Sequence, residues 1–179
     1  MNLKGTHTEK NLMKAMEGEA LAFVKYQIYA SLLGNTSKDL EMKVNHIAHN
    51  EKEHFKVWAK LLLGDTYYKD NENLLKAIEG ELYESENMYP EFARIAREEG
   101  FDEIADAFEN VSKIEGSHAW MFSDFLDRIM LNDQDQRPGS GFVCLNCGYI
   151  HLHDEAPKEC PVCHHPKQYF SREEQEDLY

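Results

Sequence analysis

Apolar side chains recur at steps of three and four residues along four long stretches of the chain, and this pattern predicts four amphipathic helices. The first stretch begins at Thr6 and Glu9, which have the spacing of a capping box. The second follows GNTSKD, residues 34–39, a sequence typical of a turn. Both are long enough to form antiparallel neighbours joined by a short connection.

The third and fourth stretches repeat this design in the middle of the chain. The third contains Tyr89 and Pro90, where we expect a kink or a short break, and it ends near Gly100. The fourth begins at Asp102. With a longer crossover near residues 63–73, the four segments predict an antiparallel four-helix bundle.

Each of the four predicted helices has one apolar face, which we call its seam, and acidic side chains, or an acid with a histidine, interrupt this seam near its middle. No Lys or Arg lies on the seams to neutralise these acids. The interrupting residues are Glu19, Glu51, His54, Glu81, Glu84, Glu115 and His118. Because carboxylates are costly to bury without positive partners, we infer that metal ions bind at this level of the core.

An internal repeat supports the metal site. AMEGE at residues 15–19 matches AIEGE at residues 77–81, and the Glu51-x-x-His54 motif recurs as Glu115-x-x-His118. Residues i and i+3 share a helix face, so each motif can bind one metal pair. One such motif alone is common on solvated helices, but two in register match the ferritin-like di-iron and di-manganese proteins. Carboxylates with one imidazole per metal favour iron or manganese over calcium or magnesium.

Two roles remain open for each of three residues near the proposed metal site. Glu84 has no counterpart in the first half of the repeat, where Ala22 stands, so it is either an extra ligand or a surface acid. Tyr26 and Tyr89 belong either to the apolar core or to a set of hydrogen-bond donors around the metal ligands.

A second module follows a polar, Gly- and Pro-containing segment. We expect a helical domain over residues 1–133, a linker over 134–140 and a small domain over 141–179. All four cysteines lie in this small domain, as two C-x-x-C motifs: Cys144, Cys147, Cys160 and Cys163. This spacing predicts a tetrahedral four-thiolate metal site.

The ligand count alone does not separate zinc from iron in this thiolate site. A redox-inert zinc would leave the buried di-metal site without an electron relay, whereas an iron bound by four cysteines can pass single electrons. The context of the helical module therefore favours iron.

Composition restricts the partners and the compartment. The formal net charge is −14, from 33 acidic and 19 basic residues. This charge argues against nucleic acid or an anionic membrane as a partner. The N-terminal sequence lacks the apolar segment of a signal peptide, and no stretch is long and apolar enough to span a bilayer. We therefore expect a cytoplasmic protein with reduced thiols.

With both modules described, the chain resembles the rubrerythrin family along nearly its whole length. The matching stretches are EGEALAFVKYQIYA, HNEKEHFK, IEGELYESENMYPEFARIAREEG, IEGSHAW and the sequence around the four cysteines. The resemblance implies an all-α ferritin-like antiparallel four-helix bundle, followed by a small rubredoxin-like metal-knuckle domain with short β-strands.

The resemblance also implies the roles of the ligands. It implies bridging carboxylates from Glu51 and Glu115, one iron held by Glu19 with Glu84 or His54, and another held by Glu81 and His118. The implied activity is a peroxidase that reduces hydrogen peroxide to water in the response to oxidative stress. Electrons would enter from a separate NAD(P)H-dependent reductase or small redox protein through the rubredoxin-like iron, which would serve the partner chain of a homodimer.

Other functional classes remain open. A ferroxidase or iron-handling protein would share the bundle but needs no thiolate relay, and an oxygenase would need an apolar substrate pocket near the irons. A zinc ribbon that binds nucleic acid is disfavoured by the acidic charge. One residue departs from the usual knuckle sequence: Gly148 follows the first C-x-x-C motif, but His164 follows the second. At this position we expect either an unusual backbone torsion or a close approach of an amide to a sulfur.

Overall fold

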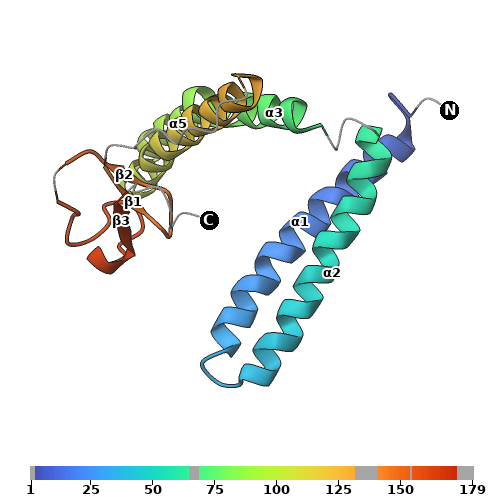
Figure 1. Ribbon diagram of the computed structural model, residues 1–179, viewed down its shortest axis with the longest axis horizontal. Helices are drawn as coiled ribbons and strands as arrows, with labels where there is room; N and C mark the ends of the chain where they lie inside the picture. Colours follow the sequence, from blue (N-terminus) through green and yellow to red (C-terminus); the bar gives the residue numbers. More distant parts are fainter. Residues whose placement is uncertain (1–2, 65–68, 132–140, 154, 173–179) are drawn as a thin grey trace. The chain divides into compact units, whose positions relative to one another are not determined.

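The computed structural model describes residues 3–64, 69–131, 141–153 and 155–172. The chain divides into two compact units, residues 1–69 and residues 70–179. Figure 1 shows the elements, which in chain order are α1 (His7–Leu33), α2 (Lys38–Leu63), α3 (Asp70–Tyr83), η2 (Glu84–Met88), α4 (Tyr89–Glu98), α5 (Asp102–Leu131), β1 (Phe142–Cys144), β2 (Ile150–His151), η3 (Lys167–Tyr169) and β3 (Phe170–Arg172).

The predicted fold class is confirmed: four long helical segments precede a small domain with three short strands and a cysteine knuckle. The third segment is the continuous run of α3, η2 and α4. None of the helices in the described part of the chain carries an apolar stretch long enough to cross a bilayer. The predicted linker, residues 134–140, lies outside the described residues, so the domain boundaries stay a prediction.

The first unit is an antiparallel hairpin of α1 and α2 (Figure 1). The predicted cap of α1 is confirmed, because the Thr6 hydroxyl accepts the Glu9 N–H at 3.1 Å. The Glu9 carboxylate in turn accepts the N–H of Gly5 at 2.6 Å, one residue earlier than in the usual capping box. Ser37 caps α2. Fully buried small side chains let the helices approach closely: Ala30, Ala48 and Ala59.

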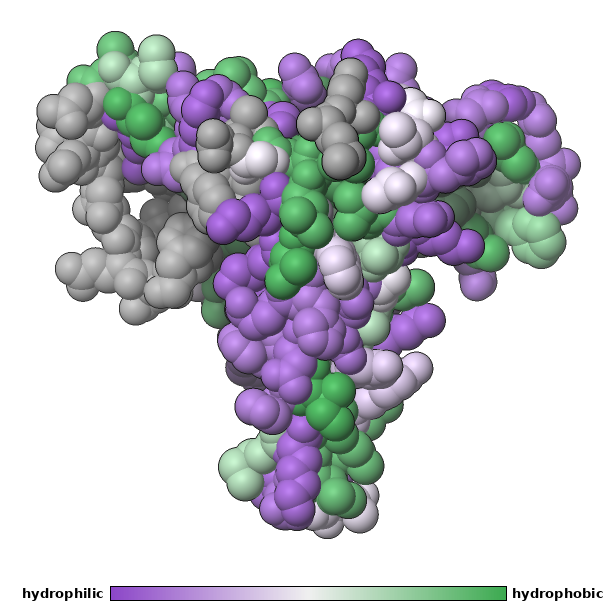
Figure 2. Space-filling view, turned by 90° about the vertical axis from the view of Figure 1, so that its right-hand side faces the viewer, coloured by the Kyte–Doolittle hydropathy of each residue, from purple (hydrophilic) through white to green (hydrophobic). Residues whose placement is uncertain are grey.

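A second apolar stripe runs along the outer side of α1. Its members are Leu21, Val24, Ile28 and Leu32, and each is more than half exposed in this unit. At 100° per residue, they lie on the side of the helix opposite Glu19. Figure 2 shows apolar side chains exposed along the limb formed by α1 and α2, which reaches the bottom of the view. A bundle closed around Glu19 would leave this stripe uncovered.

The second unit begins with α3, which continues into a π-helical segment rather than a sharp kink. In this segment, η2, the Tyr89 N–H donates to the Glu84 carbonyl five residues earlier. Pro90 provides no N–H and would clash with a carbonyl four residues earlier in an α-helix, so a wider turn before it relieves both problems. The expected break near Tyr89 and Pro90 is thus a widened turn. The helix then ends as predicted, with Gly100 at φ +86° just beyond α4.

Helix α4 packs against α5 through small and aromatic side chains. Ala93, Ala96 and Ala105 form a buried cluster against which Phe108 packs. Across the same hairpin, Arg97 donates to the carboxylates of Asp106 at 2.7 Å and Glu109 at 2.8 Å. These ion pairs are exposed, so water and salt screen them and each contributes little to stability. Close packing therefore holds the hairpin, and the charges contribute less.

The C-terminal strands form one antiparallel sheet in the order β2-β1-β3. In the register of this sheet, Val143 of β1 faces Ile150 of β2 and Ser171 of β3. The strands are only two or three residues long. Such a small core needs a further source of stability, and a metal held by the cysteines would supply it.

Candidate metal centres

Two acids and a histidine meet between α1 and α2, where Glu19 and Glu51 are half-buried and His54 is exposed. Glu19 comes from α1, and Glu51 and His54 come from α2, where their spacing puts both on one face. One ligand atom from each lies within 4.8 Å of the others. Nδ1 of His54 is 3.0 Å from Glu51 and 3.8 Å from Glu19. This group can bind a metal through two carboxylate oxygens and one imidazole nitrogen.

The second unit contains the same arrangement. Glu81 comes from α3, and Glu115 and His118 come from α5, again with ligand atoms within 4.8 Å of one another. Nδ1 of His118 is 2.7 Å from Glu115 and 3.5 Å from Glu81. Each helix pair thus holds one Glu and one Glu-x-x-His, as the repeat predicted. We call these groups the α1–α2 half-site and the α3–α5 half-site.

The carboxylates of the α3–α5 half-site lie close enough together to bind one cation. Partial burial raises the pKa of Glu81, its hydrogen bond with Glu115 raises it further, and the nearby His118 opposes this shift. Such a shift marks carboxylates that lie close together, and a positive ion bound between them would offset their mutual repulsion.

Glu84, Tyr26 and Tyr89 are not members of the two half-sites. Glu84 begins η2 and is half-buried, but it is not a member of the Glu81 cluster. Burial raises the pKa of Tyr89, and the charges of three acids, Glu84 first, raise it further. Tyr89 therefore lies close to these acids and keeps its phenolic proton as a hydrogen-bond donor. Tyr26 is half-buried, with its ring 6.2 Å from that of Tyr29.

One hydrogen bond distinguishes the two half-sites. The indole N–H of Trp58 donates to the carboxylate of Glu19 at 3.4 Å. The repeat that relates Glu51 to Glu115 places Phe122 at the position of Trp58, and a phenyl ring cannot donate. Sequence analysis did not predict this contact, because the acceptor, Glu19, lies 39 residues away along the chain. The repeat shows only that the N–H donor at position 58 has no counterpart at position 122.

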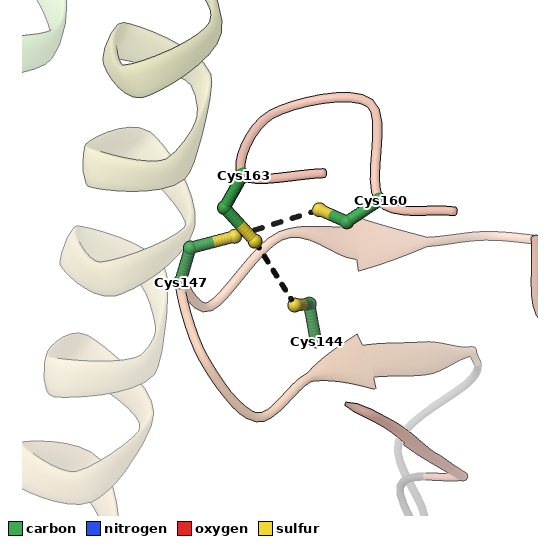
Figure 3. Close-up of side chains that lie close together, drawn as sticks. All are labelled: Cys144, Cys147, Cys160 and Cys163. Atoms are coloured by element: carbon green, nitrogen blue, oxygen red, sulfur yellow. Dashed lines mark hydrogen bonds between the residues drawn. The ribbon is translucent and has the colours of Figure 1, made fainter. Parts of the chain in front are cut away.

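The four cysteines converge from two loops of the small domain (Figure 3). The sulfur of Cys144 is 3.6 Å from that of Cys163, and the sulfur of Cys147 is 3.6 Å from that of Cys160. Four sulfurs at about 2.3 Å from a central metal form a tetrahedron with edges of about 3.8 Å. The observed spacing fits a tetrahedral thiolate metal site and is far too long for disulfides.

The two knuckles have the same backbone design. The Gly148 N–H donates to the Cys144 carbonyl at 2.8 Å, and the His164 N–H donates to the Cys160 carbonyl at 3.0 Å. Both turns need a left-handed residue, with φ +77° at Gly148 and φ +57° at His164. The unusual torsion expected at His164 is therefore confirmed. The knuckle keeps its geometry with a non-glycine residue in a strained position.

The thiol pKa values differ around the knuckle. Burial raises the pKa of Cys147 and of Cys160. Burial also opposes ionisation of Cys163, but the His165 N–H and neighbouring side chains lower its pKa to about 6. Cys163 therefore ionises more readily than Cys147 or Cys160, and it can bind an incoming metal as a thiolate. Cys147 and Cys160 would lose their protons as the metal binds.

The first knuckle lies directly against the α3–α5 half-site. A β-carbon built on Gly148 would lie 2.8 Å from Nε2 of His118 and 3.4 Å from Ile114. In Figure 3 the helix beside Cys147 has the colour of α5. His118 therefore directs Nδ1 to the carboxylates and Nε2 to the knuckle. Sequence reasoning treated Gly148 only as a turn residue and missed this contact, because the two residues are distant along the chain.

Comparison with known proteins follows this division into modules. The family model described as rubrerythrin matches residues 10–126, and the model for the rubrerythrin rubredoxin-like domain matches residues 142–171. Rubrerythrin of Nitratidesulfovibrio vulgaris is 36% identical over 193 residues, covering 94% of this chain and 95% of that protein. Rubrerythrin of Clostridium perfringens is 36% identical over 196 residues, with the same shares covered.

A solved structure of nigerythrin in its fully reduced, all-ferrous state is 28% identical. The match covers 93% of this chain and 86% of that chain, at a TM-score of 0.44, which supports no conclusion about the arrangement of the helices.

The helical half-sites and the thiolate knuckle together define a di-metal carboxylate protein with an attached rubredoxin-like site. The chain belongs to the rubrerythrin family. Its cofactor is iron, and both kinds of site fit it, since the half-sites offer oxygen and imidazole ligands and the knuckle offers four thiolates. The chain is accordingly an iron oxidoreductase of the oxidative-stress class.

Proposed function

We propose that this protein is a peroxidase that reduces hydrogen peroxide to water at a di-iron site, with electrons relayed through the thiolate iron. The proposed di-iron ligands are Glu19, Glu51, His54, Glu81, Glu84, Glu115 and His118, and the proposed thiolate ligands are Cys144, Cys147, Cys160 and Cys163. Glu51 and Glu115 are proposed to bridge the irons. When bound, two ferrous ions supply the two electrons that cleave the O–O bond.

The observation that carries this proposal is the contact of Gly148 with His118. Nδ1 of His118 meets the carboxylates and Nε2, on the opposite edge of the ring, meets the knuckle, so this imidazole supports electron entry from the thiolate site. A ferroxidase or iron-handling protein would have no use for such a contact. The peroxidase assignment is therefore favoured over that alternative.

The protein groups would control charge and protons. Five glutamates give a formal charge of −5 against +4 from two ferrous ions, so the reduced centre is electron-rich. Reduction of hydrogen peroxide to two water molecules consumes two protons as well as two electrons. Tyr89 keeps its proton close to Glu84 and Glu115 and is the proposed hydrogen-bond donor on that side. Tyr26 is proposed for the same role beside the α1–α2 half-site.

Glu84 and His54 would share one coordination position. A ferric ion has the higher charge and prefers the anionic oxygen of Glu84, whereas the neutral imidazole of His54 suits the ferrous ion. The repeat provides no second copy of Glu84, because Ala22 stands at the matching position. We therefore propose that this exchange occurs at one iron only. Crystals of one preparation, solved oxidised and then reduced, would show the exchange.

The proposed function also requires partner proteins, a second copy of the chain and an electron donor. The exposed apolar stripe on α1, opposite Glu19, supports a homodimer formed through this face. Family resemblance implies that electrons cross between chains in this dimer, whereas the Gly148–His118 contact joins residues of one chain and favours a route within the chain. The electron donor would be an NAD(P)H-dependent reductase or a small redox protein, and the proposed location is the cytoplasm, where thiols stay reduced.

Anaerobic assays with the iron-loaded protein test the function. With NADH and a reductase, a peroxidase consumes NADH only when hydrogen peroxide is added, and one NADH disappears for each peroxide. In a separate assay in air, a ferroxidase would instead oxidise added ferrous iron with O₂ and accumulate ferric iron. Oxidation of added iron without peroxide-dependent NADH consumption would contradict the proposal.

A further inference from the structure

The backbone of the π-helical segment has one carbonyl that its own pattern leaves without a donor. Within η2, the Tyr89 N–H donates to Glu84, five residues earlier. The same spacing would pair the Ser85 carbonyl with residue 90, but this residue is Pro90, which has no N–H. Ser85 follows Glu84 directly, so the state of this carbonyl bears on the position of the Glu84 side chain.

A serine from another helix supplies the missing donor. The hydroxyl of Ser112 on α5 donates to the Ser85 carbonyl at 2.7 Å, and both residues are half-buried. Gly116 lies one turn further along the same face of α5, and a β-carbon there would lie 3.0 Å from Oγ of Ser85. The missing side chain at Gly116 thus allows the close approach that the Ser112 hydrogen bond needs.

Other serines of α5 behave differently. Ser117 donates to Lys113 at 3.1 Å and Ser123 donates to Ala119 at 2.8 Å, so each returns to the carbonyl four residues earlier in its own helix. This local bond is the usual one for a serine inside a helix. Ser112 instead bonds a carbonyl of a different element, 27 residues away along the chain.

We propose that Ser112 is a positioning residue for Glu84. By completing the hydrogen bonding of η2, it fixes the wide turn and so sets where the Glu84 carboxylate lies relative to Glu81 and Tyr89. The inference rests on the proposed role of Glu84 as a ligand of the ferric state. A loosened turn would weaken binding to the ferric ion more than to the ferrous ion, so the reduction potential of the di-iron site would rise.

Redox titration of the full-length, iron-loaded protein tests this role. Ser112→Ala should weaken ferric binding about tenfold, as is usual when a group that orients a ligand is lost. For a one-electron step this is a rise of about 59 mV in the potential of the bundle irons. Ser112→Thr, which keeps the hydroxyl, should restore the original value. Ser123→Ala is the matched control and should change nothing, and the thiolate iron should keep its potential in every variant.

Two further variants separate the possible failures. Glu84→Gln should raise the potential at least as much as Ser112→Ala, and the double variant should show no additional rise. If Glu84→Gln shifts the potential and Ser112→Ala does not, Ser112 has no positioning role. If Glu84→Gln itself has no effect, the ligand role of Glu84 fails. Gly116→Ala pushes on Ser85 without touching Ser112 and should shift the potential in the same direction; an unchanged value would also overturn the inference.

Discussion

Gly148 of the first cysteine knuckle touches the imidazole of His118, with no room for a side chain between them: a β-carbon on Gly148 would lie 2.8 Å from Nε2. Only glycine meets both demands of this position, a φ of +77° and contact with a neighbouring ring. The contact joins the thiolate site to the α3–α5 half-site.

Gly148→Ala should slow electron transfer from the thiolate iron to the bundle irons. The added methyl group must displace His118 or the knuckle, which lengthens the route between them. The rate can be followed by stopped-flow absorbance after mixing reduced protein with hydrogen peroxide. Gly100→Ala is the control, because Gly100 has φ +86° and open space around it. Equal rates in the two variants would show that backbone strain alone, rather than the contact, explains the effect.

Glu51→Ala and Glu115→Ala should each remove most of the iron from the bundle and leave the thiolate iron in place. Each variant removes one proposed bridging carboxylate, and a bridge holds both metals. Iron analysis combined with the visible thiolate band distinguishes the two kinds of site. Glu53→Ala is the control, since Glu53 pairs with Lys56 on the outer side of α2. A variant that keeps its full bundle iron would remove that glutamate from the ligand set.

Trp58→Phe should weaken metal binding in the α1–α2 half-site by about two- to tenfold, the usual worth of one hydrogen bond. The change makes position 58 match Phe122, removes the donor to Glu19 and leaves a smaller aromatic ring. Anaerobic titration of the metal-free protein with cobalt(II), followed by absorbance, measures the affinity. Trp120→Phe changes a largely exposed tryptophan and should have no effect. Unchanged affinity in Trp58→Phe would mean that its hydrogen bond does not orient Glu19.

His164→Gly should stabilise the small domain by up to about 1 kcal/mol, because glycine adopts φ +57° without strain. The variant also loses the contact of His164 with Glu159 at 3.0 Å, which is exposed and contributes little. Loss of the thiolate band in increasing denaturant measures the change, and Glu159→Gln isolates the contact. A lower midpoint in His164→Gly than in Glu159→Gln would contradict this account of the knuckle.

The sequence predicted those features that depend on neighbours along the chain. The cap at Thr6, the start of α5 at Asp102 and the pairing of Glu115 with His118 follow from spacing within one helix. The internal repeat then strengthened the prediction of each half-site, because the same residue types recur at the same spacing in both halves. The thiolate site could also be predicted, since the spacing within each C-x-x-C motif indicates a metal-binding turn.

Features that join distant residues were not predicted. Pro90 indicated a disturbance of the helix, but a kink and a π turn both accommodate a proline. The hydrogen bond from Ser112 to the Ser85 carbonyl, which accompanies the π turn, comes from another helix. Likewise, the contact of Trp58 with Glu19 spans 39 residues. Spacing within one helix does not predict these partners, because they depend on how one helix packs on another.

Cys160→Ser tests most directly whether the thiolate iron delivers the electrons for peroxide reduction. All four cysteines lie after residue 141 and all proposed bundle ligands lie before residue 119. The variant should therefore keep its bundle irons and, once chemically reduced, consume one equivalent of hydrogen peroxide in a single turnover. In steady state with NADH and a reductase, we expect its peroxide-dependent rate to fall to background. A steady-state rate equal to that of the unaltered protein would contradict the relay.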